Sequence, residues 1–203
     1  MSNIATKRIK REFLELQSED GKLFHIETVN SNVLDLRGYI IGPVDTPFAG
    51  GVFNVEVKIP ETYPFNPPKV RFTTRIWHPN ISSVTGAICL DILKENWAAA
   101  LTLRTVLLSI QALLASPEPD DPQDAVVARQ FKDHPDVYRQ TASYWTAYFA
   151  TPDATKADKK RSYEAYESSI GKLMEVMQID KPTAISALST ANWNIDAAVQ
   201  NLH

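Results

Sequence analysis

Cys89 is the only cysteine of the chain and the residue best suited to covalent chemistry. It lies in a short apolar stretch, with Gly86 three residues before it and Asp91 two residues after it. Cysteine is among the most often buried residue types, so the thiol has two readings, an inert core residue or an accessible nucleophile. As a nucleophile it would act through its thiolate, which is a minor species at pH 7 when the thiol pKa is near its ordinary value of about 8.5.

Proline-containing motifs precede this stretch in a fixed order. The sequence Tyr-Pro-Phe-Asn-Pro-Pro at 63–68 leads into an alternating segment at 69–72, and His78-Pro79-Asn80 follows. A His-Pro-Asn triplet alone indicates only a turn or an extended segment. Followed by Cys-Leu-Asp at 89–91 and by Trp97, however, the whole set resembles the catalytic core of ubiquitin-conjugating enzymes, over roughly residues 4 to 149. One departure is a spacing from Asn80 to Cys89 that is one residue longer than is common in the family, with the extra length at 82–85.

The resemblance implies an enzyme that accepts ubiquitin from an activating enzyme as a thioester on Cys89. It would then pass ubiquitin to a lysine of a substrate or of another ubiquitin, which builds chains. An acyl group that arrives on another thiol is already activated, so Cys89 needs no strong neighbouring base. The resemblance implies that His78 and Pro79 are structural residues, and proton transfer by His78 is the alternative.

The transfer to lysine calls for further groups. Attack on the thioester generates an oxyanion, and the neutral amide of Asn80 is a candidate donor to it; hydrogen bonding that holds the turn is its alternative role. The attacking amine starts from a pKa near about 10.4 and must lose a proton. The resemblance places Asp121 at the gate of the site to orient this amine, with Asp91 near Cys89 as a second candidate. The alternative is an ordinary acidic, proline-rich loop at 118–122.

Partner surfaces are also implied by the resemblance. The helical pattern at residues 4 to 17 carries a basic cluster that would dock the activating enzyme, although a solvated face is the alternative; its members are Lys7, Arg8, Lys10 and Arg11. Phe65 and Ala99 match the surface that binds activating enzymes and ligases, and a core position is the alternative for Phe65. The family's usual Ser-Pro-Ala is replaced by three alanines at 98–100, which puts the choice of ligase in doubt.

Composition argues against several classes of protein. Hydrophobic residues at 44%, charged residues at 22% and a net charge of -3 are ordinary for a globular protein and give no general reason to expect nucleic acid as a partner. A single cysteine excludes an internal disulfide, and the four histidines show no metal-ligand spacing, so we expect neither metal nor cofactor. No apolar stretch approaches the roughly 20 residues of a membrane span, and a signal-peptide core is lacking, so we expect a cytoplasmic protein that also enters the nucleus.

Hydrophobic periodicity predicts an α+β catalytic core over residues 1–150. Strands are expected near 22 to 28 and 33 to 41, at 53 to 59 and at 69 to 72, and their short connections predict a four-stranded antiparallel meander. The N-terminal helix precedes them. The helices expected to follow cover 102 to 115, a short segment from about 123, and a segment that begins at Pro135.

The remaining chain is expected to form a linker and a second domain. Residues 151–161 lack periodicity, which predicts a linker and few obligatory contacts between the domains. Residues 162–203 hold three helical patterns and resemble a ubiquitin-associated domain, a three-helix bundle in which Trp193 suits the last loop. The expected ubiquitin contacts are Met177, Gln178, Ile179 and Leu202. Met-Gln-Ile in place of the usual Met-Gly-Phe, and Asn201 in place of a leucine, predict weak binding; the alternative is a bundle without ubiquitin affinity.

The favoured interpretation is a ubiquitin-conjugating transferase. Its expected partners are ubiquitin, the activating enzyme, ubiquitin ligases and protein substrates, with proteasomal degradation downstream. The alternatives are a non-catalytic ubiquitin-binding adaptor on the same fold and a carrier of another ubiquitin-like modifier. A cysteine hydrolase is disfavoured, because no Cys/His arrangement exists beyond His78.

Overall fold

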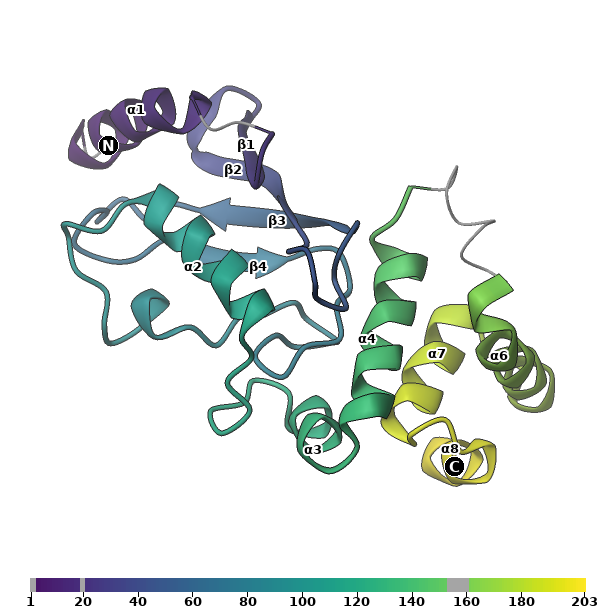
Figure 1. Ribbon diagram of the computed structural model, residues 1–203. Helices are drawn as coiled ribbons and strands as arrows, with labels where there is room; N and C mark the ends of the chain where they lie inside the picture. Colours follow the sequence, from purple (N-terminus) through teal and green to yellow (C-terminus); the bar gives the residue numbers. More distant parts are fainter. Residues whose placement is uncertain (1–2, 19–20, 153–160) are drawn as a thin grey trace.

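The computed structural model describes residues 3–18, 21–152 and 161–203. An N-terminal helix, an antiparallel sheet and a series of helices follow one another along the chain, which confirms the predicted α+β class (Figure 1). Within these described residues, no helix combines the length and the apolar character that crossing a membrane requires. The same residues contain no group of three or more acidic, histidine or cysteine side chains placed to hold a metal ion.

The sheet is the predicted meander. Strands β1 (Phe24–Val29), β2 (Asn32–Ile41), β3 (Val52–Lys58) and β4 (Lys69–Phe72) pair antiparallel in the order β1-β2-β3-β4. The alternating segment of β3 buries Phe53, Val55 and Val57, as a strand with one face on the core requires. Helix α2 (Leu103–Ala115) crosses this apolar face and buries Val106, Leu107 and Ile110 among other residues (Figure 1).

Helix ends agree with local sequence signals. Thr102 caps α2 by accepting a hydrogen bond from the backbone N–H of Thr105, and Asp124 caps α3 (Ala125–Asp133) in the same way. Pro135 occupies the first turn of α4 (Pro135–Phe149), where its missing N–H costs nothing. We define residues 118–122 as the gate loop. This loop lies between α2 and α3, both of which have side-chain caps at their N-termini.

Helix α1 (Asn3–Gln17) buries a face that contains a carboxylate as well as apolar side chains. Ala5, Ile9 and Leu16 are buried, and Glu12 is only 2% exposed. The Tyr63 hydroxyl donates to Glu12 Oε2 at 2.7 Å, and the Arg8 guanidinium lies 3.1 Å from Oε1. Burial together with the neighbouring carboxylate raises the pKa of Tyr63 well above its usual value. Sequence periodicity did not identify this buried polar cluster.

The C-terminal region has the predicted three-helix arrangement. A short 3-10 turn (η2, Arg161–Tyr163) precedes α6 (Glu164–Met177), α7 (Lys181–Thr190) and α8 (Ile195–Leu202). Asp180 and Asn194 cap the last two helices through their side chains. Of the predicted linker at 151–161, residues 153–160 lie outside the described residues.

The C-terminal bundle packs against α4, so the expectation of few contacts between the domains was wrong (Figure 1). The indole N–H of Trp145 donates to Ser189 Oγ at 2.9 Å, and that of Trp193 donates to Thr141 Oγ1 at 2.8 Å. Tyr144 adds an edge-to-face contact with Trp193, with ring centroids 5.6 Å apart. The polar sequence of a linker indicates only that the linker itself is solvated. Docking of the bundle depends instead on aromatic side chains of α4 and of the bundle that fit together.

Candidate active site

Cys89 is brought beside Asn80 by an irregular segment that follows β4. The backbone N–H of Cys89 donates to the carbonyl of Asn80 at 2.8 Å. The return turn depends on Gly86, whose φ is +76°, and a Cβ at that position would lie 1.8 Å from the backbone oxygen of Phe72. Because only glycine accepts both conditions, a side chain at position 86 would force the segment that carries Cys89 to move.

Hydrogen bonds of two serines hold the segment at 82–85. Ser82 Oγ accepts a hydrogen bond from the backbone N–H of Thr85 at 3.0 Å. Ser83 donates to Asp124 Oδ2 through its hydroxyl at 2.6 Å and through its backbone N–H at 3.1 Å. Ser83 therefore ties the segment that leads to Cys89 to the N-terminus of α3.

The Cys89 thiol is half-buried and lies between two opposite charges. Its Sγ is 3.6 Å from Asp121 Oδ2 and 3.6 Å from the ammonium nitrogen of Lys94. Burial raises the pKa of the thiol above its ordinary value; the Lys94 cation opposes this shift and the Asp121 carboxylate adds to it. The site thus presents a free, reachable thiol rather than the fully buried residue of the alternative reading.

Asn80 holds the gate loop. It is 1% exposed, and its side-chain nitrogen donates to the carbonyls of Glu118 at 2.8 Å and Asp121 at 2.9 Å. Its side-chain oxygen accepts from the backbone N–H of Glu118 at 2.8 Å. Both N–H bonds of the amide are engaged, so donation to an oxyanion requires that one of these carbonyls gives up its bond.

The two residues before Asn80 are arranged as structural residues. His78 is fully buried; its Nε2 lies 2.9 Å from the carbonyl of Leu113 and its Nδ1 accepts from the backbone N–H of Asn80 at 3.0 Å. These partners define a neutral ring with its proton on Nε2, and burial lowers the pKa of His78 to about 4. The carbonyl of Pro79 accepts hydrogen bonds from the backbone N–H groups of Gln123 and Asp124, both at 3.0 Å.

Of the two candidate carboxylates, the structure brings only Asp121 into contact with the thiol. Asp91 begins a 3-10 turn (η1, Asp91–Leu93), in which its carboxylate accepts from the backbone N–H of Ile92 at 2.8 Å and from the Asn96 amide at 3.0 Å. The sequence reading missed Lys94. The sequence shows only that a lysine follows the cysteine by five residues. Whether its ammonium lies near Sγ depends on the direction of the 3-10 turn between them.

The predicted partner surfaces divide into exposed and structural residues. Phe65 is 70% exposed, which rules out a core role, and the Trp97 indole donates to the neighbouring carbonyl of Pro64 at 2.8 Å. Lys7, Lys10 and Arg11 are exposed on α1. Arg8 instead donates to the carbonyls of Ala99 and Leu101, both at 3.0 Å. Arg8 therefore fastens α1 to the loop after Trp97, which, among the described residues, gives it a structural role that the other three basic residues lack.

In the C-terminal bundle, the predicted ubiquitin contacts lie in the first loop and in the last helix. Gln178 is exposed and has a left-handed backbone with φ of 54°. Glycine adopts this conformation without a steric penalty, whereas glutamine does not. Met177 and Ile179 are half-buried against the bundle, and Leu202 is 36% exposed.

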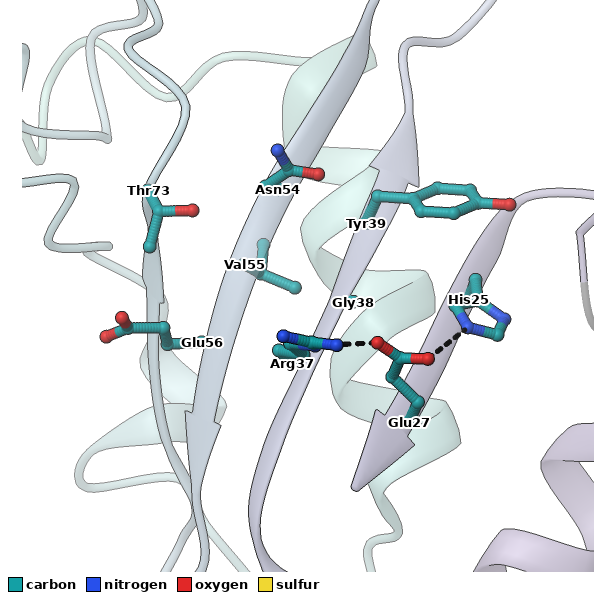
Figure 2. A pocket seen from close by; sticks show the side chains of 9 residues that line it. All are labelled: His25, Glu27, Arg37, Gly38, Tyr39, Asn54, Val55, Glu56 and Thr73. Atoms are coloured by element: carbon teal, nitrogen blue, oxygen red, sulfur yellow. Dashed lines mark hydrogen bonds and ion pairs between the residues drawn. The ribbon is translucent and has the colours of Figure 1, made fainter. Parts of the chain in front are cut away.

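A hollow of about 540 Å³ lies on the outer face of the sheet (Figure 2). The Arg37 guanidinium donates to Glu27 Oε1 at 2.6 Å and lowers the pKa of that carboxyl, while His25 lies 3.7 Å from the other carboxylate oxygen. His25 and Tyr39 stack with ring centroids 5.4 Å apart. None of the predicted site residues lines this hollow.

Known proteins place this architecture in a family. Residues 8–146 match the family model described as ubiquitin-conjugating enzyme. The whole chain is 57% identical to the ubiquitin-conjugating enzyme E2-22 kDa of Drosophila melanogaster and covers 99% of it. It is 54% identical to the human ubiquitin-conjugating enzyme E2 K and covers 98% of it. The solved E2 domain of a Toxoplasma gondii ubiquitin conjugating enzyme is 49% identical, with a TM-score of 0.68 over 72% of this chain and 99% of that one. This chain therefore belongs to the ubiquitin-conjugating enzyme family.

Proposed function

We propose that Cys89 is the residue that carries ubiquitin, as a thioester, between the activating enzyme and an acceptor lysine. The observation that supports this most directly is the position of Sγ, free and half-buried, 3.6 Å from both the Asp121 carboxylate and the Lys94 ammonium. Membership of the family supports ubiquitin as the cargo. A thiol in this setting also suits a reducing compartment, in line with the proposed cytoplasmic and nuclear location.

In the first step, the Cys89 thiolate attacks the thioester that joins the ubiquitin C-terminus to a cysteine of the activating enzyme. A new carbon–sulfur bond forms, the old one breaks, and the activating enzyme's thiolate leaves. One thioester replaces another, so no strong base is required. The ammonium of Lys94 lies where it offsets the negative charge on Sγ.

In the second step, a neutral lysine amine attacks the thioester carbonyl. A carbon–nitrogen bond forms, the bond to Sγ breaks and the Cys89 thiolate leaves, while the amine loses its proton to solvent. The Asp121 carboxylate accepts hydrogen bonds from the incoming amine and orients it. Asn80 holds the loop that carries Asp121, and its amide becomes an oxyanion donor if one of its loop carbonyls releases it.

The docking of partners is assigned to two exposed regions. Phe65 and the neighbouring loop at Ala99 form one of them, and the basic side chains of α1 form the other: Lys7, Lys10 and Arg11. In the C-terminal bundle, the loop at 177–179 and Leu202 are assigned to weak ubiquitin binding. Exposure of the loop supports this assignment, whereas Gln178 and Asn201 argue against high affinity.

Charging experiments test the proposal. With activating enzyme, ATP and ubiquitin, the full chain should form a conjugate that thiol reductants release, whereas Cys89→Ser should form an oxyester that resists them. Parallel reactions with other ubiquitin-like modifiers test the alternative cargo, and Cys89→Ala is the blank. A wild-type chain that charges with no modifier would leave the non-catalytic adaptor as the better interpretation.

A further inference from the structure

One buried side chain connects the C-terminal bundle to the region of the active site. Gln130 lies on α3 and is 3% exposed. Its Oε1 accepts from the Trp77 indole at 2.8 Å, and its Nε2 donates to the carbonyl of Ser189 at 3.0 Å and to Asn192 Oδ1 at 2.8 Å. Both donor bonds of this buried amide end on the bundle, so undocking the bundle would leave them without these partners.

Both elements that Gln130 joins on the core side lead to the active site. Trp77 directly precedes His78, Pro79 and Asn80. Helix α3 begins at the capping residue Asp124, and the backbone N–H groups of Gln123 and Asp124 donate to the carbonyl of Pro79. The gate loop with Asp121 comes immediately before these residues. A shift of α3 would therefore be transmitted to the carboxylate that lies beside Cys89.

The contact loop of the bundle has an unusual backbone. Asn192 and Trp193 both have positive φ, 50° and 64°, although neither is a glycine. Such a backbone persists only where its surroundings over-determine it, most of all for a large side chain such as tryptophan. Trp193 stacks on Tyr166 with ring centroids 3.8 Å apart and donates to Thr141 of α4. The bundle thus has a loop shaped to meet the core.

We propose that the docked C-terminal bundle positions the gate loop, and that Gln130 is the positioning residue that couples the two. The inference rests on the proposed function of Asp121 in the transfer to lysine. Docking holds α3 and the residues around Pro79 in one arrangement, which keeps Asp121 next to Sγ. Release of the bundle would leave charging of Cys89 unchanged and slow its discharge.

Two variants of the full chain separate coupling from misfolding. Gln130→Glu keeps an acceptor for the Trp77 indole but replaces the donor to Ser189 and Asn192 with carboxylate oxygen. Asn192→Gly removes one of the two acceptors on the bundle side, leaves the Ser189 carbonyl in place, and accommodates the positive φ at position 192. The matched control is Asn30→Gly, because Asn30 is exposed in the β1–β2 turn and has φ of 49°.

NMR of the uncharged chain reads docking and coupling without any activity. The indole N–H signals of Trp145 and Trp193 report docking, and that of Trp97, which bonds within the core, is the internal reference. Hydrogen exchange at the amides of Gln123 and Asp124 reports the gate region. In Gln130→Glu, and more weakly in Asn192→Gly, we expect the docking signals to shift and exchange at both amides to accelerate.

Single-turnover discharge of charged Cys89 to free lysine should slow between about twofold and tenfold in Gln130→Glu, at unchanged charging and with the Asn30→Gly control at the wild-type rate. Shifted docking signals with wild-type exchange and discharge would overturn the inference, as would unshifted docking signals in both variants. If Gln130→Glu does not fold, Asn192→Gly decides by the same criteria. Failure of the wild-type chain to charge would count against the proposed function, while the exchange measurement would still judge the coupling.

Discussion

The side-chain nitrogen of Asn80 lies 2.9 Å from the backbone carbonyl oxygen of Asp121, so a residue expected to stabilise an oxyanion also holds the loop that carries the gate carboxylate. The same amide is bonded through both its nitrogen and its oxygen to Glu118. Its structural role and the catalytic role that we propose for it therefore concern the same step, the transfer from Cys89 to lysine.

We expect Asn80→Ala and Asp121→Ala to charge normally and to discharge slowly. Loss of a well-placed oxyanion donor costs on the order of 10²-fold in rate, and we expect an effect of that size or smaller for Asn80→Ala. Because Asn80 also places Asp121, the double variant should lose less than the sum of the two single losses in free energy. Single-turnover discharge at matched loading measures this, with the exposed Glu61→Ala as control; full additivity would show that the two residues act independently.

The charges beside Cys89 predict how its reactivity depends on pH. Burial and Asp121 raise the thiol pKa and Lys94 lowers it, so Lys94→Met should move the ionisation to higher pH and Asp121→Asn to lower pH. A raised pKa means less thiolate at neutral pH. Alkylation of this single cysteine, followed against pH, measures both shifts, and the exposed Lys22→Met is the control. If the alkylation rate depends on pH in the same way in all variants, Lys94 and Asp121 do not affect the pKa of the Cys89 thiol.

Arg8 and Arg11 are a matched pair on α1 with different expected effects. Arg8→Ala removes hydrogen bonds to Ala99 and Leu101 and a partner of buried Glu12, so it should lower the free energy of unfolding by about 1–3 kcal/mol. Arg11→Ala is exposed and should change it by less than about 0.5 kcal/mol while slowing charging at low salt. Denaturant unfolding together with charging kinetics separates the two, and equal stability losses would contradict the division.

His78 predicts a decrease of stability in mild acid. Its pKa of about 4 in the folded state lies below the ordinary value of about 6.5, so the unfolded chain binds a proton that the folded chain does not. Stability from this group is complete above pH 6.5 and is lost as the pH falls towards 4, by about 2 kcal/mol between pH 6.5 and 5. Urea unfolding at several pH values gives the free energy of unfolding against pH for wild type, for His78→Gln and for the exposed control His134→Gln. The slope should be smaller in His78→Gln alone, and parallel curves for all three proteins would refute the prediction.

Local sequence determined the elements and the identity of the nucleophile. The alternation at 53 to 59, the helical spacing at 102 to 115 and Pro135 at a helix start each reflect interactions within a few residues, and the structure has these elements. Cys89 could be singled out because it is the only thiol and because the surrounding motifs are ordered along the chain. These patterns can be recognised in the sequence because backbone propensity, and the burial of one face of a helix or strand, affect residues that are close together in the chain.

Tertiary structure decided which charges meet the thiol and how the two domains join. Asp121 is 32 residues from Cys89, and the pairing of Gln130 with Asn192 spans 62 residues. Asp91 and Lys94 are both near Cys89 in sequence, yet the 3-10 turn engages the first and directs the second to Sγ. The polar linker likewise gave no sign of the docked bundle. Such contacts depend on how separate surfaces fit together in the folded chain. The residue pattern of one segment therefore does not indicate which distant segment it will contact.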